Sequence, residues 1–135
     1  MTITNALAGI AVFNIDESLV WYQQLLGRPP DRTPQETVAE WEFANGCGIQ
    51  VFEDSERGGT SSVTLIVTDI DARVDDLKKQ DIDIRATATS ETSRTASIAD
   101  PDGNQIVFAQ ILSKDASIEE TASEEAATDQ RRAIA

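Results

Sequence analysis

The side chains that could do chemistry in this chain are mainly carboxylates, because its 135 residues include no histidine and a single cysteine. The absence of histidine excludes Ser-His-Asp and Cys-His catalysis, and it excludes zinc sites of the usual His or multi-Cys kind. Candidate acids and bases are Glu40, Glu42, Asp100 and Tyr22, and no pair shows a spacing typical of acid–base catalysis. We expect Cys47 to be a small buried hydrophobe, since a reactive thiol needs a base or a cation beside it.

The composition is strongly acidic, with 24 Asp and Glu against 11 Lys and Arg, a net charge of −13 and a pI near 4.2. Binding to phosphate groups requires basic patches, so this charge argues against nucleic acid as a partner. The same field would attract a cationic ligand. No apolar run is long enough for a membrane span, and the apolar stretch 6–13 lacks the features of a signal peptide. These observations predict a cytoplasmic protein that does not bind membranes.

One segment predicts a tight turn between two apolar runs: Asp100-Pro101-Asp102-Gly103-Asn104. Proline pre-sets φ, glycine accepts a positive φ, and Asp and Asn side chains can bond to nearby backbone groups. We therefore expect a hairpin that joins a strand over 95–99 to a strand over 105–111.

The first half of the chain predicts the order β-α-β-β-β. A buried strand over 6–13 precedes a helix whose N-cap residues are supplied by the segment 14–18 and which Gly27 ends. A loose strand near Thr33 follows, and then strands over 38–43 and 48–52 are joined by Asn45-Gly46, a strong hairpin signal.

The second half repeats this order. It predicts a strand over 62–68, a helix capped by the segment Asp69-Ile70-Asp71, a short strand over 82–85 and the final hairpin. The capping motif Asn14-Ile15-Asp16 in the first half matches Asp69-Ile70-Asp71 in the second half. We predict one domain over 1–112, with modules over about 4–54 and 61–112. Residues 113–135 form an acidic, Ala/Glu-rich tail that we expect to lie outside the core.

Two such modules, with Asn14–Tyr22 and Leu25-Leu26-Gly27 in the first and Asp100–Asn104 in the second, resemble the vicinal oxygen chelate superfamily over residues 4 to 112. That superfamily includes glyoxalase I, extradiol dioxygenases, and fosfomycin- and bleomycin-resistance proteins. The resemblance implies an α+β fold in which two βαβββ modules form a curved, cup-like mixed sheet with the helices outside. It also implies ligands inside the cup and a homodimer.

Metal-using members of the superfamily carry His or Glu at cup positions that correspond here to Leu7, Gln50, Ser62 and Val107. Two aliphatic side chains, an amide and a hydroxyl are not the imidazole or carboxylate ligands that such metal sites need. The comparison predicts no metal, no other cofactor and no catalytic residues. It argues against metal-dependent glyoxalase or dioxygenase activity.

Strand alternation then selects the side chains that would line the cup. Apolar residues supply contact area, polar ones orient the ligand, and Trp41 is a candidate both for stacking and for the core. The predicted ligand-binding residues are Leu7, Phe13, Trp41, Gln50, Phe52, Ser62, Thr64, Ile66 and Val107.

The sequence favours a metal-independent binding protein that resembles bleomycin-resistance-type proteins and sequesters or senses a small organic molecule, neutral or cationic. Two alternatives stay open: a metal-independent lyase or isomerase of the same superfamily, and a structural or regulatory interaction module. A cavity with convergent polar groups would favour binding, whereas a cup filled by its own side chains would favour the structural role.

Overall fold

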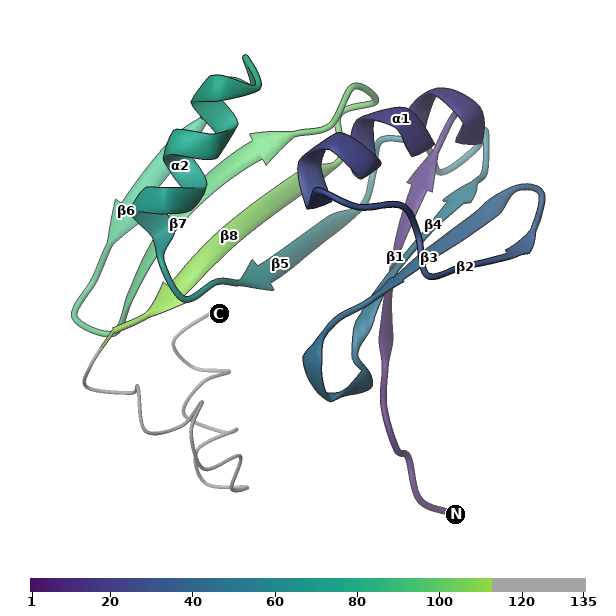
Figure 1. Ribbon diagram of the computed structural model, residues 1–135, viewed down its shortest axis with the longest axis horizontal. Helices are drawn as coiled ribbons and strands as arrows, with labels where there is room; N and C mark the ends of the chain where they lie inside the picture. The colour runs from purple at the N-terminus through teal and green to yellow at the C-terminus, as the bar shows by residue number, and fades with distance from the viewer. Residues whose placement is uncertain (113–135) are drawn as a thin grey trace. The chain divides into compact units, whose positions relative to one another are not determined.

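Two four-stranded sheets with equivalent strand orders make up the described residues, 1–112, of this computed structural model (Figure 1). The orders are β1-β4-β3-β2 and β5-β8-β7-β6, so each module permutes its strands in the same way. This arrangement confirms the predicted α+β fold with two βαβββ modules. The predicted tail at 113–135 lies outside the described residues.

The first module contains β1 (Leu7–Val12), α1 (Ile15–Leu26), β2 (Arg32–Gln35), β3 (Val38–Glu42) and β4 (Gly48–Glu53). The second contains β5 (Ser62–Ile66), α2 (Ile70–Lys79), β6 (Ala86–Thr89), β7 (Ser93–Ala99) and β8 (Gln105–Ile111). In the first sheet β1 runs parallel to β4, whereas β3 is antiparallel to both β4 and β2.

The compact units of the structure differ from these modules in two respects. One unit is formed by Met1–Val63 together with Ala99–Gln105, and the other, within the described residues, by Thr64–Ile98 and the chain from Ile106 to Leu112. The first unit thus includes the first two residues of β5. The turn between β7 and β8 therefore belongs to the first unit, although the rest of its hairpin belongs to the second.

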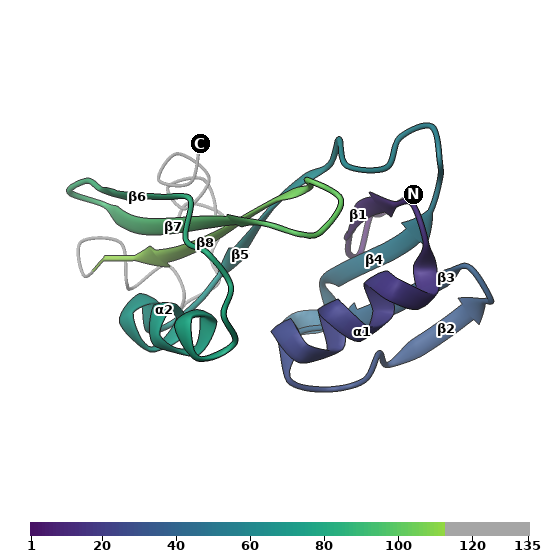
Figure 2. The same ribbon diagram turned by 90° about the horizontal axis from the view of Figure 1, so that it is seen from above.

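Helix α1 begins and ends where the sequence predicts. The Asn14 side chain accepts a hydrogen bond from the Glu17 N–H, and Gly27 closes the helix with a φ of 77°. One face of the helix is buried against one face of the first sheet, along which it lies in Figure 2. The core between them includes Ile10, Val12, Tyr22, Leu25, Trp41, Ile49 and Val51.

Helix α2 is capped by the Asp69 side chain, which accepts from the Ala72 N–H, and it lies along one face of the second sheet (Figure 2). The strand predicted over 82–85 is wrong, because β6 begins only at Ala86. The Ile82 N–H donates to the Leu77 carbonyl and so closes the helix end. The apolar alternation of Ile82 and Ile84 therefore reflects partial burial rather than a sheet ladder.

The prediction that Cys47 is buried is also wrong. Asn45 and Gly46 both take positive φ, 69° and 81°, in the turn between β3 and β4. Cys47 follows this turn, is exposed, and lies with its Sγ 3.4 Å from the Ala44 carbonyl oxygen. The turn places the thiol in solvent, ahead of the buried strand that starts at Gly48.

The carboxylate of Asp100 holds the turn between β7 and β8, and the residue is only 5% exposed. Its Oδ1 accepts hydrogen bonds from the backbone N–H groups of Asp102, at 3.0 Å, and Asn104, at 2.8 Å. Its Oδ2 accepts from the Tyr22 hydroxyl of α1 at 2.7 Å. A turn predicted as a local hairpin is therefore bonded to a helix 78 residues away in the sequence.

Asn104, also buried, extends this network to β1. Its Nδ2 donates to the Ala11 carbonyl and to Asp100 Oδ2, both at 2.8 Å, while its Oδ1 accepts from the Ser61 N–H. Asp102 Oδ2 accepts from the Phe13 N–H at 2.8 Å. Because buried polar groups are costly when unpaired, each of these bonds fixes the turn against the first unit.

The chain's single tyrosine, Tyr22, should keep its proton far above its ordinary pKa of 10.0. Burial raises this pKa, as do the negative charge of Asp100 and the hydrogen bond to it. Protonated Tyr22 contributes to the free energy of unfolding. This contribution is fully present below the pKa of Tyr22 in the unfolded chain, and it is lost as the pH rises above that value towards the higher pKa of the folded protein. Tyrosinate absorbance should therefore appear only together with loss of the native circular dichroism spectrum.

Chain unfolded in urea is the control for this titration, since there Tyr22 should ionise near its ordinary pKa. Ionisation of Tyr22 near that value in protein that keeps its native spectrum would contradict the buried Tyr22–Asp100 contact.

Candidate functional site

The face of the first sheet opposite α1, here called the helix-free face, carries several of the predicted ligand-binding residues. Cross-strand register places Gly9, Gln50 and Glu40 side by side in one row. The next row contains Ala11, Phe52 and Val38. Because cross-strand and diagonal neighbours lie within reach of one another, Glu40, Gln50 and Phe52 form one contiguous patch.

Glu40 is the central polar group of this patch and is only 8% exposed. Its Oε2 accepts from Gln50 Nε2 at 2.7 Å, and its Oε1 accepts from Arg32 Nε at 3.1 Å. The hydrogen bond from Gln50, followed by that from Arg32, holds the pKa of Glu40 below its ordinary value of 4.5. This side chain is therefore an ionised, fixed hydrogen-bond acceptor at neutral pH.

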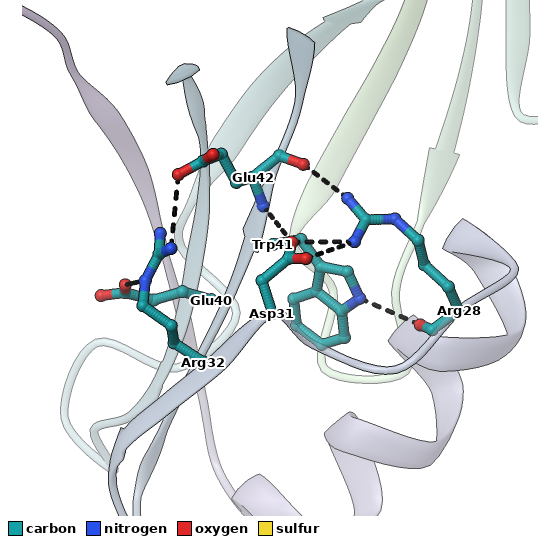
Figure 3. Close-up of polar contacts among 6 residues, drawn as sticks. All are labelled: Arg28, Asp31, Arg32, Glu40, Trp41 and Glu42. Carbon is teal, nitrogen blue, oxygen red and sulfur yellow. Dashed lines mark hydrogen bonds and ion pairs between the residues drawn. The ribbon is translucent and has the colours of Figure 1, made fainter. Parts of the chain in front are cut away.

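Arg32 also reaches Glu42, whose Oε1 lies 3.3 Å from Arg32 Nη1 (Figure 3). One guanidinium therefore faces two carboxylates in this cluster, which leaves an excess of negative charge on this part of the helix-free face.

Phe52 is half-buried and lies against the backbone of Gly9, where a Cβ would come within 3.1 Å of its ring. The guanidinium of Arg57 stands over the ring, with Cζ 5.3 Å from the centroid. Asp54 holds Arg57 through an ion pair of 2.8 Å. The aromatic surface of Phe52 is thus already in contact with a cation.

Two further predicted residues, Leu7 and Phe13, are exposed. Leu7, at the start of β1, lies beside Gly48 in the row next to Gln50. Phe13 is 51% exposed and its ring packs over the loop at Gly58, where a Cβ would come within 2.6 Å of it.

Trp41 does not belong to the helix-free face. It is 0% exposed on the helix-covered face, and its Nε1 donates to the Arg28 carbonyl at 3.0 Å. Figure 3 shows Trp41 and its neighbour Glu40 pointing to opposite sides of β3. The expectation that Trp41 could stack on a ligand is therefore corrected: strand alternation makes it part of the core.

On the second sheet, alternation places Ser62, Thr64 and Ile66 on the face of β5 opposite the buried Val63, and Val107 opposite the buried Ile106 and Phe108 of β8. Ser62 Oγ donates to Gln105 Oε1 at 3.2 Å and is exposed. Thr64 and Val107 are half-buried and Ile66 is exposed. These residues supply apolar area and hydroxyl groups on a sheet separate from that of Gln50.

The acids and bases considered from the sequence do not assemble into a catalytic pair. Tyr22 and Asp100 are buried and bonded to each other in the turn network. Glu42 is exposed and paired with Arg32. Glu40 alone combines burial with a position on the helix-free face.

The positions equivalent to the superfamily's metal ligands do not fit a metal. Leu7 and Val107 offer no donor atom, Ser62 is hydrogen-bonded to Gln105, and the Gln50 amide donates to Glu40. Within residues 1–112, no cluster of three His, Cys, Asp or Glu side chains could hold a metal ion. Neither helix of this region is long and apolar enough to cross a bilayer.

A separate open hollow of about 790 Å³ lies beside the start of α1 and the turn between β2 and β3. Its lining is largely polar and includes Asp16, Glu36 and Glu53. It contains none of the predicted ligand-binding residues.

Sequence reasoning missed Arg32 and Arg57 as parts of this site. The sequence did contain a signal for the cluster around Glu40. In a hairpin whose turn is centred on Asn45, residues equally distant from Asn45 lie opposite each other on the two strands. Glu40 and Gln50 are such a pair. No comparable signal existed for Arg57, whose side-chain direction depends on a loop and on Asp54.

Comparison with known proteins is consistent with this geometry. The family model described as Glyoxalase/Bleomycin resistance protein/Dioxygenase superfamily matches residues 4–108. A glyoxalase/bleomycin resistance protein from Catenulispora acidiphila DSM 44928 is 32% identical, with a TM-score of 0.74 over 82% of this chain and 100% of that chain.

Two further solved structures show the same fold at lower identity. A bleomycin resistance determinant encoded on the transposon Tn5 is 16% identical, with a TM-score of 0.66 over 78% of this chain and 95% of its own. A virulence protein from Salmonella typhimurium is 21% identical, with a TM-score of 0.62 over 83% and 98%. No curated protein sequence matches the chain.

Replacing Gln50 with alanine should raise the pKa of Glu40, because Gln50 donates the hydrogen bond that contributes most to lowering it. Ionised Glu40 contributes to the free energy of unfolding at any pH above its pKa in the unfolded chain, and this contribution is lost as the pH falls through its lower pKa in the folded protein. In Gln50→Ala, the loss of this contribution should begin at higher pH. A carbon-13 titration of the Glu40 carboxyl measures the shift directly.

The matched control is Gln24→Ala on the exposed side of α1, which should leave the Glu40 titration unchanged. An identical Glu40 pKa in wild type and Gln50→Ala would show that the bond does not persist in solution.

Proposed function

Because the chain belongs to the glyoxalase/bleomycin resistance protein/dioxygenase superfamily, we propose that it binds a small organic molecule without a metal ion. The binding surface proposed is the helix-free face of the first sheet. The observation that carries this proposal is the buried, ionised Glu40 fixed by Gln50 and Arg32 beside the half-buried ring of Phe52.

The chemistry of this patch suits recognition better than turnover. Ligand sites combine apolar and aromatic area with a few fixed polar groups that orient the bound molecule. Phe52 supplies the aromatic area, and Glu40 and Gln50 supply an acceptor and an amide in the adjacent row. A carboxylate held by two donors is poorly suited to accept a proton, since its pKa is lowered.

The charge of the patch favours a neutral or cationic ligand. Glu40 and Glu42 face a single guanidinium from Arg32, and the whole chain carries a net charge of −13. An anion would lose solvation and gain repulsion here, whereas a cation would be attracted over distances limited by ionic strength.

The homodimer stays a prediction that the family resemblance implies, and the cytoplasmic location stays a prediction drawn from the sequence. Ser62, Thr64, Ile66 and Val107 likewise stay predicted ligand contacts on the second sheet.

A calorimetric screen tests the proposal. The panel contains aromatic metabolites, cationic glycopeptide antibiotics including bleomycin, and multiply charged anions. For the tightest ligand we expect Glu40→Gln to weaken binding about tenfold or more, because a hydrogen bond to a charged group is lost. Asp75→Asn, which removes an exposed charge on α2, should change affinity far less.

The proposal fails if the tightest ligand is a multiply charged anion. It also fails if Glu40→Gln and Gln50→Ala bind that ligand as well as wild type does.

A further inference from the structure

The guanidinium of Arg57 marks the position on the helix-free face where a cation is already accommodated. Its Cζ lies 5.3 Å from the centre of the Phe52 ring, within the distance at which the electron-rich face of an aromatic ring attracts a cation. One edge of the ring lies close to Gly9, and Val38 is the cross-strand partner of Phe52. Phe52 therefore has neighbours within its own sheet in addition to Arg57.

Arg57 itself is held only from one side. Asp54 accepts from Arg57 Nε at 2.8 Å, and it also accepts from the Glu56 and Arg57 backbone N–H groups. The side chain of Arg57 is nevertheless 67% exposed. An exposed ion pair of this kind is weak, so Arg57 can leave the ring while Asp54 keeps the loop in place.

A ligand cation over the same ring would gain a partner that Arg57 does not contact. Glu40 pairs with Gln50 in the strand register, and Gln50 lies two residues before Phe52 on the same face of β4. The carboxylate is thus a diagonal neighbour of the ring. A planar cation stacked on Phe52 could point its N–H groups towards Glu40. Each Glu40 oxygen accepts one hydrogen bond, Oε1 from the planar guanidinium of Arg32 and Oε2 from Gln50, and a carboxylate oxygen can accept a second.

We infer that the Phe52 ring, with Glu40 beside it, is the subsite for a planar organic cation of the amidinium or guanidinium type, and that Arg57 is an internal competitor which such a ligand displaces. This inference rests on the proposed function, whose ligand class it narrows. By this inference Arg57 lowers the affinity of the Phe52 subsite for cations by competing for the ring, and it makes no contact with the bound ligand.

Three compounds of the same shape test this: benzamidinium, benzamide and benzoate, which are cationic, neutral and anionic. Affinities are measured by NMR titration of the full chain, with the Phe52 ring and Arg57 Nε–H signals as reporters. Benzamidinium should bind in preference to benzamide, and benzoate should not bind. Benzamidinium should shift the Arg57 signal as that side chain leaves the ring.

Arg57→Gln should tighten benzamidinium binding about two- to fivefold, because the competing cation is removed. The matched control is Arg73→Gln, which removes the same charge from a guanidinium that stands 5.3 Å from the Phe108 ring on the second sheet. It should leave the affinity nearly unchanged. Phe52→Leu should weaken binding and abolish the gain from Arg57→Gln in the double variant.

The inference is overturned if Arg57→Gln and Arg73→Gln have equal effects, if benzamide binds as tightly as benzamidinium, or if benzamidinium leaves the Phe52 signals unshifted at millimolar concentration. The proposed function still holds after such a result if the calorimetric screen yields a ligand whose affinity is lowered by Glu40→Gln. If the screen yields no such ligand, the proposed function and this inference are both wrong.

Discussion

The first unit depends on the carboxylate of Asp100, buried between the turn it belongs to and helix α1. Tyr22, Asp102 and Asn104 all donate hydrogen bonds to this group, and Asn104 in turn bonds to β1. Taking a carboxylate out of water is costly unless its oxygens are satisfied, so burial of Asp100 depends on these bonds. That requirement ties a turn near residue 100 to a strand and a helix within the first 26 residues. It thereby fixes the end of β1, whose neighbour β4 carries Gln50 and Phe52.

Local signals predicted most of the fold. Asn14, Gly27 and Asp69 cap helices, as their residue types suggest. The repeated order of strands and helix in the two modules follows from apolar alternation and from turn residues. The errors arose where the detailed backbone geometry of a helix end and of a turn decides. Ile82 closes a helix instead of starting a strand, and Cys47 lies in solvent because the turn before it takes positive φ at two residues. The link between Asp100 and Tyr22 could not be predicted, since no local pattern specifies a partner 78 residues away.

The strands that form the candidate site could be predicted from the sequence, but the positions of only some of its side chains could. Alternation correctly placed Gln50 and Phe52 on one face and allowed for Trp41 in the core. In the structure Glu40 lies on the face of Gln50, yet a glutamate in a strand is usually a solvated group. Its burial follows from two donors that converge on it, Gln50 across one strand pair and Arg32 across the other. The position of Arg57 over Phe52 depends on how a loop folds around Asp54, which composition and spacing do not encode.

We propose that the helix-free face of the first sheet is a ligand-binding surface organised by Glu40, Gln50 and Phe52. A crystal structure of the protein with the tightest ligand from the screen would show where that ligand binds. We expect difference electron density for the ligand against the Phe52 ring and within hydrogen-bonding distance of Glu40 or Gln50. Ligand density confined to the hollow beside Asp16 and Glu53, or to the surface of either helix, would contradict it.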